Sequence, residues 1–185
     1  MKPVPIEILQ NCQRKDRRAQ YELFQLVHGF MTGLCKRYYL NKEDRSSIAN
    51  AAFLKLLKSL ENKIPDGSLE AWCRTITMNT IIDDFRKNKK RISMMTTNNE
   101  AMGEDISEAT YNEVNAKFEK EEFENLLHQL PEMTRYVFNL FAIEGFTHAE
   151  IASNLHISDG TSKWHVSEAR RLLKMALEKS ISKRA

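Results

Sequence analysis

The sequence predicts an all-α protein made of two small helical domains joined by a polar, acidic linker. Apolar residues recur at steps of three and four, no segment alternates as a strand does, and a long polar stretch interrupts the pattern near mid-chain. A chain of 185 residues has room for one medium core or two small ones. We therefore expect domains at residues 10–92 and 118–180, with residues 93–117 as the linker.

Composition and charge exclude several classes of protein. Apolar residues make up 42% of the chain and charged residues 29%, as in soluble domains, and no apolar run approaches the ~20 residues that span a bilayer. The N-terminus lacks the pattern of a secretory signal, so we expect a cytoplasmic protein. Cys12, Cys35 and Cys73 form no CxxC pair, which favours buried, unreactive thiols over disulfides or a zinc cluster, and no cofactor is expected.

Three helices are expected in the N-terminal domain. The first starts after a cap at Asp16, the second runs from about Glu43 to Leu60, and Ser68 caps the third after a turn that contains Pro65 and Gly67. Their apolar stripes are Phe24, Val27, Met31, Leu34, Cys35 and Tyr38 in the first, Ile48, Ala52, Leu56 and Leu60 (widened by Phe53, Leu54 and Leu57) in the second, and Leu69, Trp72, Cys73, Ile76, Ile82 and Phe85 in the third.

A run of basic residues follows the third stripe. Its members are Arg86, Lys87, Lys89, Lys90 and Arg91. This density suits a polyanion such as a nucleic-acid backbone, but cations at the end of a helix are also favoured by the helix dipole, and the run alone leaves both interpretations open. Between Glu100 and Glu124 nine acidic residues face only two lysines, so this stretch would repel DNA.

The C-terminal domain opens with two helices. The first carries Phe123, Leu126, Leu127 and Leu130. The second is expected to have Pro131 as its first residue and to stop at Gly145.

Two further helix starts lie close together after Gly145. Thr147 and Glu150 have the spacing of a capping box, and Ser158 can cap another helix after a turn of only a few residues. The expected buried residues are Ile151, Ala152 and Leu155 in the first helix and Ser162, Val166, Ala169 and Leu173 in the second. The opposite face of the second helix presents Lys163, Trp164, Ser167, Arg170 and Arg171. This arrangement is typical of a DNA-binding helix-turn-helix, and an ordinary antiparallel helical hairpin is the alternative.

Two motifs add a family resemblance. The stretch "LPEMTRYVFNLFAIEGFTHAEIASNLHISDGTSKWHVSEARRLLK" resembles region 4 of extracytoplasmic-function (ECF) sigma factors of the sigma-70 family, in its "LPE" entry, its "EIA" helix, its "GT" turn and its closing "ARRLL". The stretch "AWCRTITMNTIIDDFRKNKKR" is similar to region 2, with matches at Trp72, Ile76, Asn79, Asp83 and Arg86. The two motifs occur in the family's order and together cover most of the chain.

This resemblance implies a bacterial initiation factor without catalytic chemistry. Such a factor binds core RNA polymerase and promoter DNA, and an anti-sigma factor usually regulates it. Region 4 would contact the −35 element through Lys163, Trp164, Ser167 and Glu168, with Arg170 and Arg171 on phosphates. Since Glu168 stands where a basic residue is common, and a carboxylate can accept a hydrogen bond from cytosine N4, we expect an unusual promoter preference.

Region 2 would contact the −10 element. By the same resemblance, the loop "ENKIPDGSLEAW" would hold a base flipped from the melted strand, and Asn79 would line the site. The implied −10 residues are Lys63, Ser68, Leu69, Asn79, Arg86 and Lys87. For Trp72, packing in the core is the favoured alternative, and a buried side chain bonded to backbone explains Asn79 equally well.

The polymerase-binding helix departs from the family pattern. Its segment "SIANAAF" has Ser47, Asn50 and Ala51 where Asp, Gln and Glu are common. The residues implied to bind core polymerase are Ile48, Asn50, Phe53, Leu56 and Leu57. The loss of the usual polar contacts puts the strength of this binding in doubt.

Other functional classes remain open from the sequence. A helix-turn-helix repressor or activator would not need the motif from Trp72 to Arg91, and an adaptor that binds only protein would not need the basic face of the last helix. An enzyme is least favoured because no phosphate loop, nucleophile triad or metal-ligand cluster is found. His148, His156 and His165 are spaced as in no standard zinc motif.

Overall fold

The computed structural model describes residues 3–93 and 120–184, with side chains except those of residues 89–93, 120–122 and 180–184. Every regular element within these ranges is a helix, which confirms the all-α class. The chain divides into two compact units, Met1–Phe85 and Arg86–Ala185. The predicted linker lies outside the described residues except for Ser93, so its boundaries stay a prediction.

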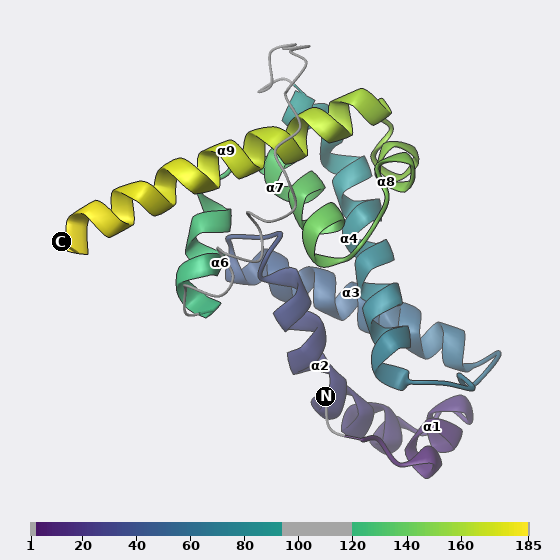
Figure 1. The fold of residues 1–185 in the computed structure, drawn as a ribbon. Helices are drawn as coiled ribbons and strands as arrows, with labels where there is room; N and C mark the ends of the chain where they lie inside the picture. Colours follow the sequence, from purple (N-terminus) through teal and green to yellow (C-terminus); the bar gives the residue numbers. More distant parts are fainter. Residues whose placement is uncertain (1–2, 94–119, 185) are drawn as a thin grey trace. The chain divides into compact units, whose positions relative to one another are not determined.

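The first unit contains the helices α1 (Ile6–Gln13), α2 (Arg17–Cys35) and α3 (Lys42–Leu60) and most of α4 (Leu69–Ser93). Helix α2 packs against both α1 and α3 (Figure 1). The predicted stripe is buried from Val27 to Cys35 in α2, and Tyr38, just beyond the helix, is buried as well. Since burial of such a stripe supplies most of the stability of a short helix, these contacts define the unit's core.

The caps of this unit follow the sequence. The carboxylate of Asp16 accepts a hydrogen bond of 2.7 Å from the Ala19 N–H, as predicted. The Asn41 side chain accepts one of 2.9 Å from the Glu43 N–H and so begins α3. Ser68 accepts a longer bond of 3.3 Å from the Ala71 N–H at the start of α4.

Helix α1 is absent from the sequence prediction. Its residues Ile8, Leu9 and Cys12 are buried, so the expected domain start at residue 10 falls inside a packed helix. The prediction of three helices in this unit is therefore wrong. An eight-residue helix presents only two turns of pattern, too little for its periodicity to stand out.

Polar contacts tie α4 to its neighbours in the first unit. The Tyr39 hydroxyl donates to an Asp84 carboxylate oxygen at 2.8 Å, and Lys55 of α3 pairs with Asp83 of α4 at 2.8 Å. The buried face of α4 consists of Cys73, Thr77, Met78, Thr80, Ile81, Ile82 and Phe85. The buried hydroxyl of Thr77 donates to the Cys73 carbonyl at 2.7 Å, so no unpaired hydroxyl is left in the core at this position.

The second unit contains α6 (Lys120–His128), α7 (Glu132–Phe138), a π-helical turn η1 (Asn139–Ile143), α8 (His148–Leu155) and α9 (Asp159–Arg184). Helix α9 packs against α6, α7 and α8. One apolar cluster of this unit joins α6, α7 and α9 through Phe123, Leu126, Leu127, Leu130, Phe138, Ala169 and Leu173.

Two details of α7 differ from the prediction. Pro131 is the N-cap of α7 rather than its first residue, so the helix begins at Glu132. The α-helix also stops at Phe138 and continues as the π turn η1, where the expected pattern ran on as one helix. Gly145 ends the segment with φ +78°, as predicted, because a residue without Cβ adopts this left-handed conformation readily.

The three cysteines are buried and unpaired, as the sequence predicts. Burial raises the pKa of Cys12 to about 11 and those of Cys35 and Cys73 to about 12, so each thiol stays protonated at neutral pH. Within the described ranges, no helix combines the length and apolar character needed to cross a bilayer.

The two leucines Leu54 and Leu56 of α3 provide a test of this core. Leu56 is fully buried and Leu54 is 65% exposed. Leu56→Ala should lower the free energy of unfolding by about 2–5 kcal/mol because it leaves a cavity. Leu54→Ala should change it by less than about 0.5 kcal/mol. Denaturant titration of both variants checks this, and equal losses would show that the orientation of α3 is incorrect.

Candidate nucleic-acid interface

The turn between α8 and α9 is defined by local hydrogen bonds. Thr147 and Glu150 form the predicted capping box: the Glu150 N–H donates to the Thr147 hydroxyl at 3.2 Å, and the Thr147 N–H donates to the Glu150 carboxylate at 2.8 Å. These bonds lower the pKa of Glu150, so the box keeps its charge at neutral pH. His156 ends α8 in the left-handed conformation with φ 53°, and Ser158 accepts from the Thr161 N–H at 3.0 Å to cap α9.

The predicted buried stripe of α9 is confirmed. Ser162, Val166, Ala169 and Leu173 are all at most 4% exposed, and Ile151 and Leu155 of α8 are fully buried. Ala152 is only half-buried. Since this stripe faces the core, the other side of α9 faces solvent, as a helix that enters a groove of DNA must.

Two histidines fix α9 and α8 within the unit. His165 is 5% exposed, and its Nδ1 lies 3.0 Å from the Thr134 hydroxyl of α7. His148 Nδ1 lies 2.9 Å from the buried Ser162 hydroxyl, and its ring stacks on Phe141 with centroids 4.3 Å apart. These contacts leave both rings engaged inside the fold. Burial lowers the pKa of His165 to about 4, so it is neutral at pH 7.

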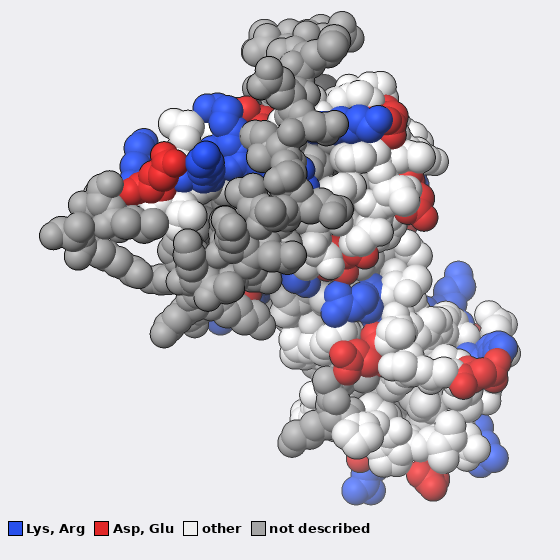
Figure 2. Space-filling view, in the orientation of Figure 1, with Lys and Arg blue, Asp and Glu red and all other residues white. Residues whose placement is uncertain are grey.

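The six predicted −35 residues all lie on α9, and they differ in exposure. Lys163 and Arg171 are exposed, whereas Trp164, Ser167, Glu168 and Arg170 are half-buried. The Trp164 ring packs edge-on against His165, with centroids 4.8 Å apart. Lys and Arg side chains, with carboxylates among them, line part of α9 in the view of Figure 2.

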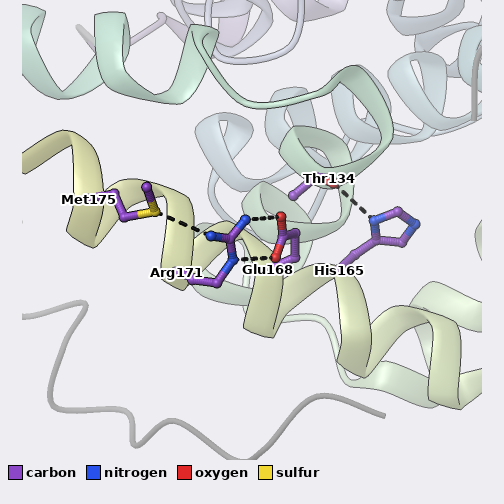
Figure 3. Close-up of polar contacts among 5 residues, drawn as sticks. All are labelled: Thr134, His165, Glu168, Arg171 and Met175. Carbon is purple, nitrogen blue, oxygen red and sulfur yellow. Dashed lines mark hydrogen bonds and ion pairs between the residues drawn. The ribbon is translucent and has the colours of Figure 1, made fainter. Parts of the chain in front are cut away.

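The cationic side chains on this face have intramolecular contacts that the sequence did not predict. Lys163 pairs with Asp159 at 2.9 Å. The Arg170 guanidinium lies 6.0 Å from the centroid of the Phe141 ring. Arg171 donates from Nε and Nη2 to the two carboxylate oxygens of Glu168 at 2.8 and 2.7 Å (Figure 3). DNA phosphates would have to compete with these groups.

The predicted −10 residues belong to α4 and to the loop before it. Asn79 is exposed, so the alternative of a buried side chain is excluded. Lys63 and Lys87 are exposed, and Lys63 pairs with Asp66. Leu69 and Arg86 are half-buried, and Ser68 is exposed and serves as the cap described above. Trp72 is also half-buried, which fits partial core packing.

The predicted polymerase-binding residues divide into two groups. Ile48, Phe53 and Leu56 are at most 8% exposed, so they pack into the first unit and support α3 from inside. Asn50 is exposed and Leu57 is half-buried. The sequence prediction did not select Leu54, whose side chain is 65% exposed. Spacing alone could not show that Leu54 is exposed, because the apolar face of the helix is wide and also contains Phe53, Leu56 and Leu57.

His148, His156 and His165 do not gather into a metal site. In the part of the chain that the structure describes, no three histidines, cysteines or carboxylates form a group that could hold a metal ion. The chemistry available on α9 and on the exposed part of α4 is hydrogen bonding and charge.

Comparison with known proteins finds two family models in the chain. Residues 23–91 match sigma-70 region 2, and residues 120–173 match sigma-70 region 4. The RNA polymerase sigma-H factor of Pseudomonas aeruginosa is 25% identical over 180 residues, 93% of each chain. The ECF RNA polymerase sigma factor SigL of Mycobacterium tuberculosis is 32% identical over 108 residues, 58% of this chain and 59% of SigL.

The chain is also similar to a solved structure. The sigma factor RpoE, in complex with the anti-sigma factor NepR from Bartonella quintana, aligns with 85% of this chain and 96% of its own at 18% identity and a TM-score of 0.49.

Burial of His165 should make the stability of the protein depend on pH. Its pKa is about 4 in the folded state and 6.5 ordinarily, so between these values the unfolded chain binds the extra proton. Stability is therefore full above about pH 6.5 and falls as the pH drops toward about 4, by up to about 3 kcal/mol. His165→Gln should lose this part of the pH dependence. The free energy of unfolding of both proteins is measured as a function of pH. If it falls equally in both between pH 6.5 and 4, His165 is not the cause of the loss.

Proposed function

The chain belongs to the sigma-70 family of RNA polymerase sigma factors, in its extracytoplasmic-function group. From this premise we propose which surface binds the polymerase and which surfaces bind promoter DNA. As a sigma factor it binds core RNA polymerase and directs initiation at selected promoters. The exposed side of α9 contacts the −35 element, α4 and its preceding loop contact the melted −10 strand, and the solvent face of α3 binds the polymerase.

One observation carries this proposal: both sigma regions occur in order, at residues 23–91 and 120–173. A repressor with a helix-turn-helix would require only the second region, and a protein adaptor would require neither. Both alternatives are therefore less favoured. No step of the proposed function calls for a catalytic residue or a cofactor.

At the −35 element, we assign base contacts to Lys163 because it lies in the first turns of α9, where recognition helices contact bases. Trp164 and Ser167 follow within the next turn, and Glu168 lies just beyond it. Arg170 lies over Phe141, which can hold the guanidinium in place for a phosphate. Asp159, the ion-pair partner of Lys163, must give up this contact when Lys163 binds a base.

At the −10 element, the exposed Asn79 has amide groups free of the core that can bond a base from the separated strand. Lys63 and Lys87 supply positive charge for the backbone. Ser68 and Leu69 shape the loop end, since the Ser68 side chain caps α4. Because Trp72 is half-buried, we assign its ring to packing within the protein rather than to stacking on a base.

The polymerase surface is best assigned to the exposed residues of α3. Asn50, Leu54 and Leu57 reach solvent at spacings of four and three, so they lie on one face of the helix. Burial of the apolar Leu54 side chain against the polymerase can contribute binding energy in place of the polar contacts that are usual in the family. Ile48, Phe53 and Leu56 then contribute indirectly, because their burial sets the rotation of this helix.

Partners and place follow from the same function. Core RNA polymerase and promoter DNA are its partners, and an anti-sigma factor is proposed as regulator, as in the complex of RpoE with NepR. A factor that acts with bacterial polymerase works in the cytoplasm. We propose domain limits of 6–92 and 118–180, so that the first domain includes α1.

Leu54→Ala tests the polymerase surface. Loss of a buried interface side chain should weaken binding to core polymerase by about 1–2 kcal/mol, roughly 5- to 30-fold in Kd. Leu40→Ala, which removes another leucine that is 60% exposed but lies outside α3, is the control and should leave the affinity unchanged. Fluorescence titration of the full chain with core polymerase measures both. If the wild-type chain neither binds the polymerase nor supports promoter-dependent transcription, the proposed function is wrong.

Lys163→Ala tests the DNA surface. On the preferred promoter it should cost about 1–3 kcal/mol and relax discrimination at one base pair, because a base contact is lost. Lys179→Ala removes an exposed lysine of the same helix about 24 Å further along its axis and should have little effect. Competition binding of the polymerase complex to promoter variants measures both. Unchanged affinity and base preference in Lys163→Ala would leave α8 and α9 as a protein-binding hairpin.

A further inference from the structure

Arg171 is held by two side chains of its own helix, Glu168 and Met175. Its guanidinium donates two bonds of 2.7 and 2.8 Å to Glu168 and a third of 3.2 Å from Nη1 to the sulfur of Met175. Figure 3 shows the guanidinium between these two side chains. Lys163, nearer the start of α9, pairs with Asp159 at 2.9 Å.

The Glu168 carboxylate occupies the donors with which Arg171 would bind a phosphate. A guanidinium presents its N–H groups as a planar fork, and a carboxylate and a phosphate use the same two-bond geometry. Glu168 is held in place for this contact because its side chain is only 24% exposed, compared with 52% for Arg171. The bond lowers the pKa of Glu168, so the carboxylate is ionised at neutral pH. A nearby phosphate must therefore displace a charged competitor.

The major groove offers the carboxylate a second partner. The amino group of cytosine is a donor that glutamate can accept in the major groove, whereas a phosphate repels it. When Glu168 turns to such a donor, it leaves Arg171, and the guanidinium becomes available to the backbone. Contact with the right base and contact with the phosphate would then occur together.

We propose that Glu168 is a specificity-determining residue that acts through Arg171, holding the guanidinium away from DNA phosphates except where a cytosine amino group takes over the carboxylate. This inference rests on the proposed function, since it assumes that α9 lies in the groove of a promoter. It goes further by making the phosphate contact of Arg171 conditional on sequence. Arg171 is then no general backbone contact.

A double-mutant cycle of Glu168→Gln and Arg171→Ala tests this coupling. Each variant is bound, as the full chain with core polymerase, to a duplex with the −35 sequence selected from a random pool and to the same duplex with that element scrambled. Salt is kept low and constant, because phosphate contacts depend strongly on it. The same cycle is run on the full chain alone, which tests the coupling separately from polymerase binding.

The expected result differs between the two duplexes. In the wild-type background, Arg171→Ala should weaken the selected duplex about fivefold and the scrambled one less than about twofold. Glu168→Gln should tighten the scrambled duplex about two- to fivefold, in the range of an exposed ion pair, and this gain should vanish in the double variant. Arg171→Lys keeps the charge but loses the fork, so it should also bind the scrambled duplex more tightly.

Two results would overturn the inference. If Arg171→Ala weakens both duplexes by the same factor, Arg171 is an unconditional phosphate contact. If the gain from Glu168→Gln persists without Arg171, the carboxylate acts by direct repulsion of DNA. Thermal midpoints of all variants verify folding. Promoter-dependent transcription by the wild type is measured separately. Its absence would contradict the proposed function, whereas the two results above contradict only the coupling of Glu168 and Arg171.

Discussion

The hydrogen bond between Thr134 of α7 and His165 of α9 fixes the rotation of α9, and the rest of the second unit depends on that rotation. A helix can roll about its axis as long as only apolar contacts hold it, because these are not directional. A buried polar pair is directional, since each partner would be left unsatisfied after a roll. With His165 held inward, Lys163 and Arg171 point to solvent on the opposite side.

Much of this second unit could be predicted from the sequence because its signals are local. A capping box requires only two residues three apart, as in Thr147 and Glu150, and the stripe of α9 requires only a period. The π turn η1 and the pairing of Arg171 could not be predicted in this way. A π turn depends on how the segment packs, and the choice among several carboxylates for one guanidinium depends on rotamers that the sequence does not specify.

The first unit shows a different limit. The apolar face of α3 is wide, and a 3.6-residue period does not say whether Leu54 or Leu56 points inward. The packing of α2 and α1 against α3 decides this, and Leu54 is left outside. Asn79 illustrates the same point for a polar residue, since its exposure depends on which side of α4 is covered. The residues implied by resemblance therefore fall into two groups. Exposed residues can contact a partner, and buried residues fix the orientation of the helix that carries them.

The three buried cysteines have a consequence for how opening of this protein can be followed. All of them lie in the first unit, and the sequence has none in the second. Because burial keeps each thiol protonated, a thiol-specific reagent added at neutral pH reacts at an appreciable rate only with molecules whose first unit has opened. The rate of thiol modification therefore reports opening of the first unit alone, and opening of the second unit does not change that rate.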